Sequence, residues 1–160
     1  MKRLTFLFPA LVLAAACSTS PISYTASTPT PQDGAYSCAL RKVNELGFTV
    51  VNTDRQGGFI TAEKQTSGLG TALLTGRKYT DALTVSIFDG ADAQSRTIRV
   101  TAAQVTENAM GFGAASKTGI KPSPTGIKAA QEVLTACAPG SAPVQQTSAT
   151  VFAVSGTLTD

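Results

Sequence analysis

Two segments in the middle of the chain alternate between apolar and polar residues, and this pattern restricts the fold more than any other feature. Leu83, Val85 and Ile87 are each separated by one residue, and residues 98–105 begin with the same spacing. Because successive side chains of a strand point to opposite faces of a sheet, both segments predict strands with one buried face. A sheet of this kind needs a second layer of structure over its apolar face.

Two amphipathic helices, one on each side of these strands, are expected to form that layer. The first is predicted over residues 34–46, with Asp33 as its cap and Gly47 at its end. The second is predicted to begin with Ser123 as its cap and Pro124 as its first helical residue. The apolar residues that recur at helical spacing are Tyr36, Leu40, Val43 and Leu46 in the first helix and Ile127, Ala130, Leu134 and Cys137 in the second.

Two further strands are predicted between the first helix and the alternating segments. Residues 48–51 and 59–64 flank a turn at residues 54–58, where two glycines can adopt a positive φ. The predicted fold class is therefore α+β with two layers. A four-stranded antiparallel sheet is covered on one face by an N-terminal and a C-terminal helix, in the order α-β-β-β-β-α. We expect this single globular domain to cover residues 34–138.

The segments on either side of this domain are rich in small polar residues. Residues 17–33 contain many Ser, Thr and Pro residues and bury too little apolar surface to fold alone. We interpret them as a flexible tether. Residues 139–160 are interpreted as a C-terminal tail, in which residues 151–154 fit either an edge strand or a disordered segment.

The N-terminus has the pattern of an export signal. Lys2 and Arg3 precede an apolar stretch that ends in three alanines and Cys17. This stretch is shorter than the about 20 residues that a transmembrane helix needs. The alternative is an ordinary signal peptide that ends beside an accidental Cys.

The run Leu13-Ala14-Ala15-Ala16-Cys17 resembles the lipobox of bacterial lipoproteins, which often have Leu where this chain has Ala14. The resemblance implies that residues 1–16 are a cleaved signal peptide and that Cys17 becomes the lipid-bearing N-terminus, with a membrane as its partner. Several acyl chains together form a stable anchor. In a Gram-negative cell, Ser18 after the Cys implies transport to the outer membrane, where the domain would face the periplasm.

A second, shorter resemblance covers residues 40–61. A helix is followed there by Gly47-Phe48-Thr49-Val50, then by Asp54-Arg55 and Gly57-Gly58-Phe59-Ile60. This pattern is similar to the helix-hairpin units of small outer-membrane lipoproteins, such as the lipoprotein C component of the β-barrel assembly machinery. It consists mostly of generic hairpin residues, and it implies a helix packed on a sheet.

Cys38 and Cys137 remain as a pair once Cys17 is assigned to the lipid. An even pair in an exported chain predicts a disulfide, and the two residues lie 99 positions apart. In the chain-entropy model, such a bridge stabilises the folded state by up to about 4.7 kcal/mol. The alternative is two buried thiols that pack as small apolar side chains. Because the chain has no His, we expect no metal site.

The sequence lacks the residues of common catalytic sites. Without His, neither a Ser-His nor a Cys-His nucleophile can form. A catalytic Ser-Lys pair remains possible, at Ser116 with Lys117 or at Ser67 with Lys64. Closeness in the sequence does not, however, position the two side chains for proton transfer. Basic and acidic residues number 13 and 10, with no basic cluster. We therefore predict no enzyme activity, no catalytic residue, no cofactor and no nucleic-acid partner.

The Gly-rich segments 66–80 and 108–121 carry several apolar residues, and exposed apolar residues in loops mark contact surfaces. The alternative is packing against the core as a satellite cluster. The candidate contact residues are Leu69, Leu73, Leu74, Met110 and Phe112.

These features favour a non-catalytic binding or scaffold module, with a cell-envelope protein as a candidate partner. One alternative is a small exported hydrolase. Another is a carrier that holds a small apolar ligand in a groove lined by Tyr36, Phe59, Phe88 and Leu134.

Overall fold

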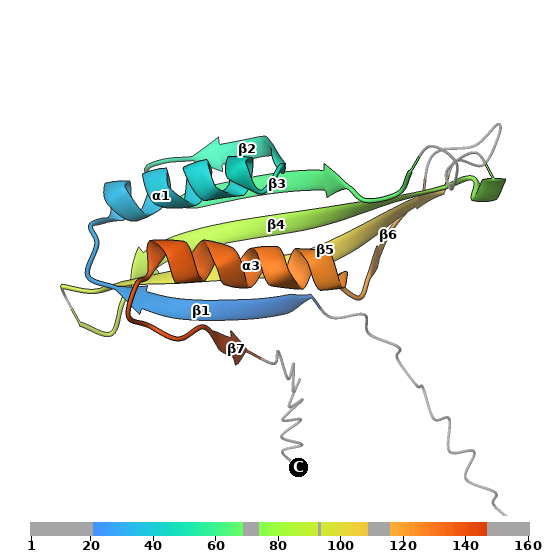
Figure 1. The fold of residues 1–160 in the computed structure, drawn as a ribbon. Helices are drawn as coiled ribbons and strands as arrows, with labels where there is room; N and C mark the ends of the chain where they lie inside the picture. Colours follow the sequence, from blue (N-terminus) through green and yellow to red (C-terminus); the bar gives the residue numbers. More distant parts are fainter. Residues whose placement is uncertain (1–20, 69–73, 93, 109–115, 147–160) are drawn as a thin grey trace, which may run out of the picture.

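The computed structural model describes residues 21–68, 74–92, 94–108 and 116–146, and these form one antiparallel sheet with two helices on one face (Figure 1). The elements in chain order are β1 (Ile22–Thr28), α1 (Gln32–Glu45), β2 (Thr49–Asp54), β3 (Phe59–Gln65), β4 (Arg77–Asp89), β5 (Arg96–Asn108), β6 (Ser116–Ile120), α3 (Pro124–Cys137) and β7 (Val144–Gln146).

The sheet has seven strands, so the prediction of a four-stranded sheet in the order α-β-β-β-β-α is wrong. Its strands follow the order β2-β3-β4-β5-β1-β7, and β6 pairs with β5 beyond the end of β1. The four predicted strands correspond to β2, β3, β4 and β5, of which β4 and β5 are each 13 residues long. The additional strands β1, β6 and β7 lie in segments that the sequence pattern assigns to a tether, a loose loop region and a tail.

The first of these strands, β1, lies within the predicted tether. Its residues alternate in burial: Tyr24, Ala26 and Thr28 are buried, whereas the Ser and Thr residues between them are more exposed. β1 pairs with β5 from Ile22 opposite Ala102 to its end. The low apolar content of the segment favours disorder, but β-branched Thr and aromatic Tyr favour strands when a neighbouring strand is available to pair. The period-two alternation of this segment was the signal that could have revealed it.

The two other additional strands are short and depend on pairing with their neighbours. β6 runs antiparallel to the end of β5, with Ile120 opposite Gln104. β7 pairs with β1, with Val144 opposite Thr25, and thus occupies part of the predicted C-terminal tail. The edge strand considered for residues 151–154 lies outside the described residues.

Both predicted helices are present, with bounds shifted by at most two residues. Ser123 caps α3, because its hydroxyl accepts a hydrogen bond from the Gly126 amide at 3.0 Å, and Pro124 follows as the first helical residue. The expected cap at Asp33 is wrong: α1 begins after Pro31 without a side-chain cap, and Asp33 lies in the first turn. There its negative charge interacts favourably with the positive end of the helix dipole.

The core lies between the two helices and the inner face of the sheet. Alanines make up a large share of it, which lets the helices approach the sheet closely but contributes little apolar area per residue. The sheet supplies larger side chains, with Ile60, Leu83 and Ile98 fully buried. The buried helical residues are Ala35, Tyr36, Ala39 and Val43 in α1 and Ala129, Ala130, Val133, Leu134 and Cys137 in α3.

Candidate functional site

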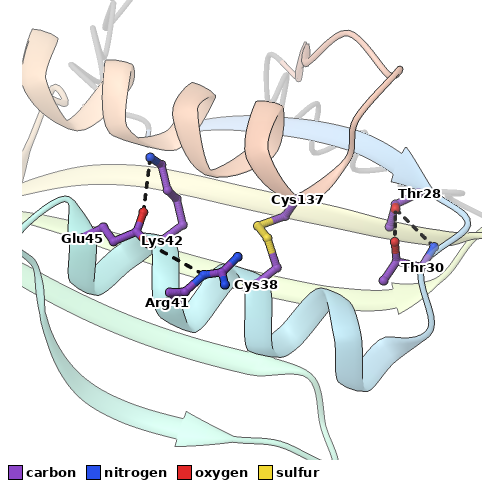
Figure 2. The surroundings of a disulfide bond; sticks show 7 residues. All are labelled: Thr28, Thr30, Cys38, Arg41, Lys42, Glu45 and Cys137. Carbon is purple, nitrogen blue, oxygen red and sulfur yellow. Dashed lines mark hydrogen bonds and ion pairs between the residues drawn. A yellow bond between two sulfur atoms is a disulfide. The ribbon is translucent and has the colours of Figure 1, made fainter.

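A disulfide between Cys38 and Cys137 joins the two helices, as the sequence predicted (Figure 2). Cys38 lies within α1 and Cys137 is the last residue of α3, and their Cα atoms are 5.7 Å apart. Because the two residues are 99 positions apart, the bridge closes most of the domain into one loop. It therefore stabilises a small, alanine-rich core chiefly by restricting the unfolded chain.

A buried polar cluster connects the sheet to the start of α3, and the sequence reasoning missed it. The carboxylate of Asp81, on β4, is fully buried. One of its oxygens accepts a hydrogen bond from the Ser123 hydroxyl at 2.5 Å, and the other accepts one from the Gln104 amide at 2.9 Å. Asp81 continues the alternation of Leu83 and Val85 backward by one step, which was the signal for its position on the buried face.

The chemistry of this cluster is structural. A carboxylate near the N-terminus of a helix interacts favourably with the helix dipole, and both oxygens of Asp81 have hydrogen-bond donors. Ser123 uses its hydroxyl to bond Asp81 and to cap α3 at the same time. Both groups are thus occupied in holding α3 on the sheet.

The Ser-Lys pairs considered from the sequence are not assembled among the described side chains. Ser67 accepts a hydrogen bond from the Tyr79 amide at 3.0 Å. The ammonium of Lys64 donates to the carbonyl oxygen of Leu46 at 2.7 Å, at the end of α1. The side chains of Ser116 and Lys117 lie outside the described part of the structure.

The four residues expected to line a ligand groove lie on opposite faces of the sheet. Tyr36 and Leu134 are buried in the core between helices and sheet. Phe59 and Phe88 alternate with the core residues Ile60 and Ile87 and therefore lie on the face without helices. Phe88 is 38% exposed, and its ring centroid lies 5.1 Å from the guanidinium carbon of Arg99. The structure thus does not form the groove that this set of residues predicted.

Two surface hollows occur near the ends of α1. The smaller one is lined by Thr125 as well as by lysines and Glu132, but among the described side chains no hydrogen bond joins the Thr125 hydroxyl to a Lys or to Glu132. One, of about 180 Å³, lies between the end of α1 and the start of α3 and includes Lys64 and the paired Lys128 and Glu132. The other, of about 450 Å³, is bordered by the ion pair of Asp33 and Arg55. Among the described residues, no group of three potential metal ligands is present.

One end of the sheet projects beyond the helices as a three-stranded arm (Figure 1). The start of β4, the end of β5 and β6 form it, with Arg77 opposite Asn108 and Asn108 opposite Ser116. Leu74 precedes β4 at this end and is 89% exposed. The other candidate contacts, Leu69, Leu73, Met110 and Phe112, lie outside the described residues.

No protein-family model matches the chain, and comparison with curated proteins finds no match. In the described part of the chain, neither helix is long and apolar enough to cross a membrane. The function of the protein is therefore inferred from its sequence and from the geometry of its domain.

Proposed function

We propose that this protein is a lipoprotein of the bacterial cell envelope, anchored through Cys17, whose domain acts as a non-catalytic binding or scaffold module. The observation that carries the proposal is the position of Cys17, directly after an export signal and only five residues before the start of β1. The anchor in this proposal lies in the outer membrane, and the domain faces the periplasm.

The disulfide supports an exported location. Stable disulfides form in oxidising compartments and are rare in the bacterial cytoplasm. The bridge between Cys38 and Cys137 leaves Cys17 as the third and last Cys of the chain. A lone Cys next to a cleavage site is the residue that a lipid would modify.

The start of β1 makes the tether shorter than the sequence suggested. Ile22 lies five positions after Cys17, and an extended chain of this length spans at most about 18 Å. Pro21 directly before β1 further limits the conformations of this segment. A lipid on Cys17 would therefore hold the domain against the membrane, so that its contacts are made close to the bilayer.

A non-catalytic role is supported by how the described polar residues are used. Asp81 and Ser123 connect α3 to the sheet, Lys64 bonds the end of α1, and Ser67 bonds β4. A hydrolase would need an ordered set of acid, base and nucleophile around an open cleft.

The test is the intact mass of the mature protein from isolated membranes, before and after thiol reduction. We expect a chain from Cys17 to Asp160 with added acyl groups, and a gain of two hydrogen atoms on reduction. The Cys17→Ser variant should lose the acyl groups and leave the membrane fraction. A wild-type chain without lipid in the soluble fraction would overturn the anchor and revive the exported hydrolase.

A further inference from the structure

We propose that the tip of the three-stranded arm, formed by Leu74, Arg77 and Lys78, contacts the lipid surface to which the protein is anchored. This inference rests on the proposed function, because it takes Cys17 as the anchored residue. The occupant is an anionic lipid bilayer.

The first argument is the direction of the strands. Ile22 of β1 and Leu83 of β4 both lie opposite Ala102, on the two sides of β5. β1 is antiparallel to β5, so the residues before Ile22 approach the sheet from the C-terminal end of β5. The arm extends toward that same side, so the chain enters β1 at the end of this strand that faces the arm (Figure 1).

The second argument compares two lengths. From the level of Ile22, β4 continues for six residues from Leu83 to Arg77, which is about 20 Å of strand. The tether from Ile22 back to Cys17 spans at most about 18 Å. A domain held this closely, with an arm of this length on the anchored side, brings the arm tip to the membrane surface.

The third argument is the distribution of charge. The described residues of the arm, 77–81, 104–108 and 116–121, carry four basic residues and two acidic residues, of which Asp81 is buried. The opposite end of the sheet, with the turns at 54–58 and 89–96 and the start of α1 at Asp33, carries four acidic and two basic residues. Anionic lipids attract basic residues near their surface by about 1 kcal/mol each, so the field of the molecule favours the arm-first orientation.

The fourth argument is the chemistry of the tip. Leu74 is almost completely exposed, and Arg77 and Lys78 follow it at the start of β4. The ammonium of Lys78 lies 4.0 Å from the carboxylate of Glu107 on β5, and the Lys78 side chain is 46% exposed. The twelve residues from Gln65 to Gly76 contain no charged side chain, so the basic pair stands at the boundary of an uncharged segment. An apolar side chain beside a basic pair matches the boundary between acyl chains and phosphate groups.

The test uses the absence of Trp from the native chain. A Leu74→Trp variant of the lipidated protein carries a single Trp at the arm tip, and Ala91→Trp is the matched control in an exposed turn at the opposite end. Both proteins are reconstituted into vesicles of phosphatidylethanolamine and phosphatidylglycerol with brominated acyl chains. On reconstitution, we expect the Trp emission of the Leu74→Trp variant to shift to shorter wavelength and to be quenched. The emission of the Ala91→Trp variant should stay unchanged.

The basic pair is tested separately in a chain without the lipid, Cys17→Ser with Leu74→Trp. Arg77→Gln with Lys78→Gln should weaken its binding to phosphatidylglycerol vesicles by about 5-fold to 30-fold, because Glu107 neutralises part of the charge of Lys78. The matched control is Arg41→Gln with Lys42→Gln, an adjacent Arg-Lys pair on α1, which should leave binding unchanged. Equal losses from both pairs would show attraction by net charge alone and would overturn the assignment to the arm.

The outcomes separate this inference from the proposed function. If mass analysis shows acyl groups on Cys17 but the Leu74→Trp variant is quenched no more than the Ala91→Trp variant, the anchor stands and the arm contact is wrong. A blue shift at the arm tip that brominated lipids do not quench would indicate packing against protein and would also overturn the contact. If Cys17 carries no acyl group, the proposed function itself fails.

Discussion

The carboxylate of Asp81 accepts a hydrogen bond from the hydroxyl of Ser123 at 2.5 Å, and this contact joins the middle of the sheet to the start of the last helix. The two residues are 42 positions apart in the sequence. Ser123 also caps α3, and Gln104 bonds the second oxygen of the carboxylate. The orientation of α3 on the sheet therefore depends on a buried polar group as well as on apolar packing.

Asp81→Ala should lower the free energy of unfolding by about 3 kcal/mol, because it removes a charged acceptor and leaves Ser123 and Gln104 without their partner. Asp92→Ala, in an exposed turn, is the control and should change stability by less than about 0.5 kcal/mol. Denaturant unfolding of both variants measures the difference. Equal stability of the two would mean that the buried cluster contributes nothing to the fold.

The disulfide should make a large contribution to the free energy of unfolding, because the core is small. Replacing Cys38 and Cys137 with Ser should lower the free energy of unfolding by about 2–5 kcal/mol. Reducing agent should destabilise the wild-type protein by a similar amount and leave the double variant unchanged. Unfolding curves with and without reductant measure both effects, and a wild-type curve indifferent to reductant would contradict the role of the bridge.

Gly58 and Gly140 offer a matched test of backbone strain and steric space. Both have positive φ, +65° and +86°, but a Cβ at Gly58 would lie 2.5 Å from the carbonyl oxygen of Ile87, whereas Gly140 has open space. Gly140→Ala should cost about 1 kcal/mol from the left-handed backbone alone. Gly58→Ala should cost more than Gly140→Ala, since the clash adds to a similar backbone cost. Thermal or denaturant unfolding decides, and the reverse order would refute the steric argument.

Two leucines at opposite extremes of burial test where the core ends. Leu134→Ala should lower the free energy of unfolding by about 3 kcal/mol, because Leu134 is fully buried in α3. Leu74→Ala, at an 89% exposed position, should change it by less than about 0.5 kcal/mol. Denaturant unfolding of both variants gives the two values. A large loss of stability from Leu74→Ala would show that this residue packs into the fold, and would also weaken the case for its contact with lipid.

The sequence predicted correctly those strands and helices whose apolar residues recur at a regular spacing. The alternation of Leu83, Val85 and Ile87 and the helical spacing of the last helix both correspond to elements of the structure, and Ser123 with Pro124 marks the start of α3 correctly. These signals are local because the apolar residues that face the core recur with the period of the strand or helix to which they belong. The pairing of Cys38 with Cys137 also followed from the sequence, since an exported chain with one Cys assigned to the lipid leaves a single pair.

Tertiary structure decided the elements that have no strong pattern of their own. β1, β6 and β7 form because β5 and β1 offer free backbone hydrogen-bonding groups along their sides. The same pairing placed Phe59 and Phe88 on the opposite face from Tyr36 and Leu134, which removed the predicted groove. By itself, the amino-acid sequence determined the helices, the main strands and the disulfide pair. Only the folded sheet decided the number of strands, the pairing of the chain from Ile22 onward and the burial of Asp81, because these depend on residues far apart along the chain.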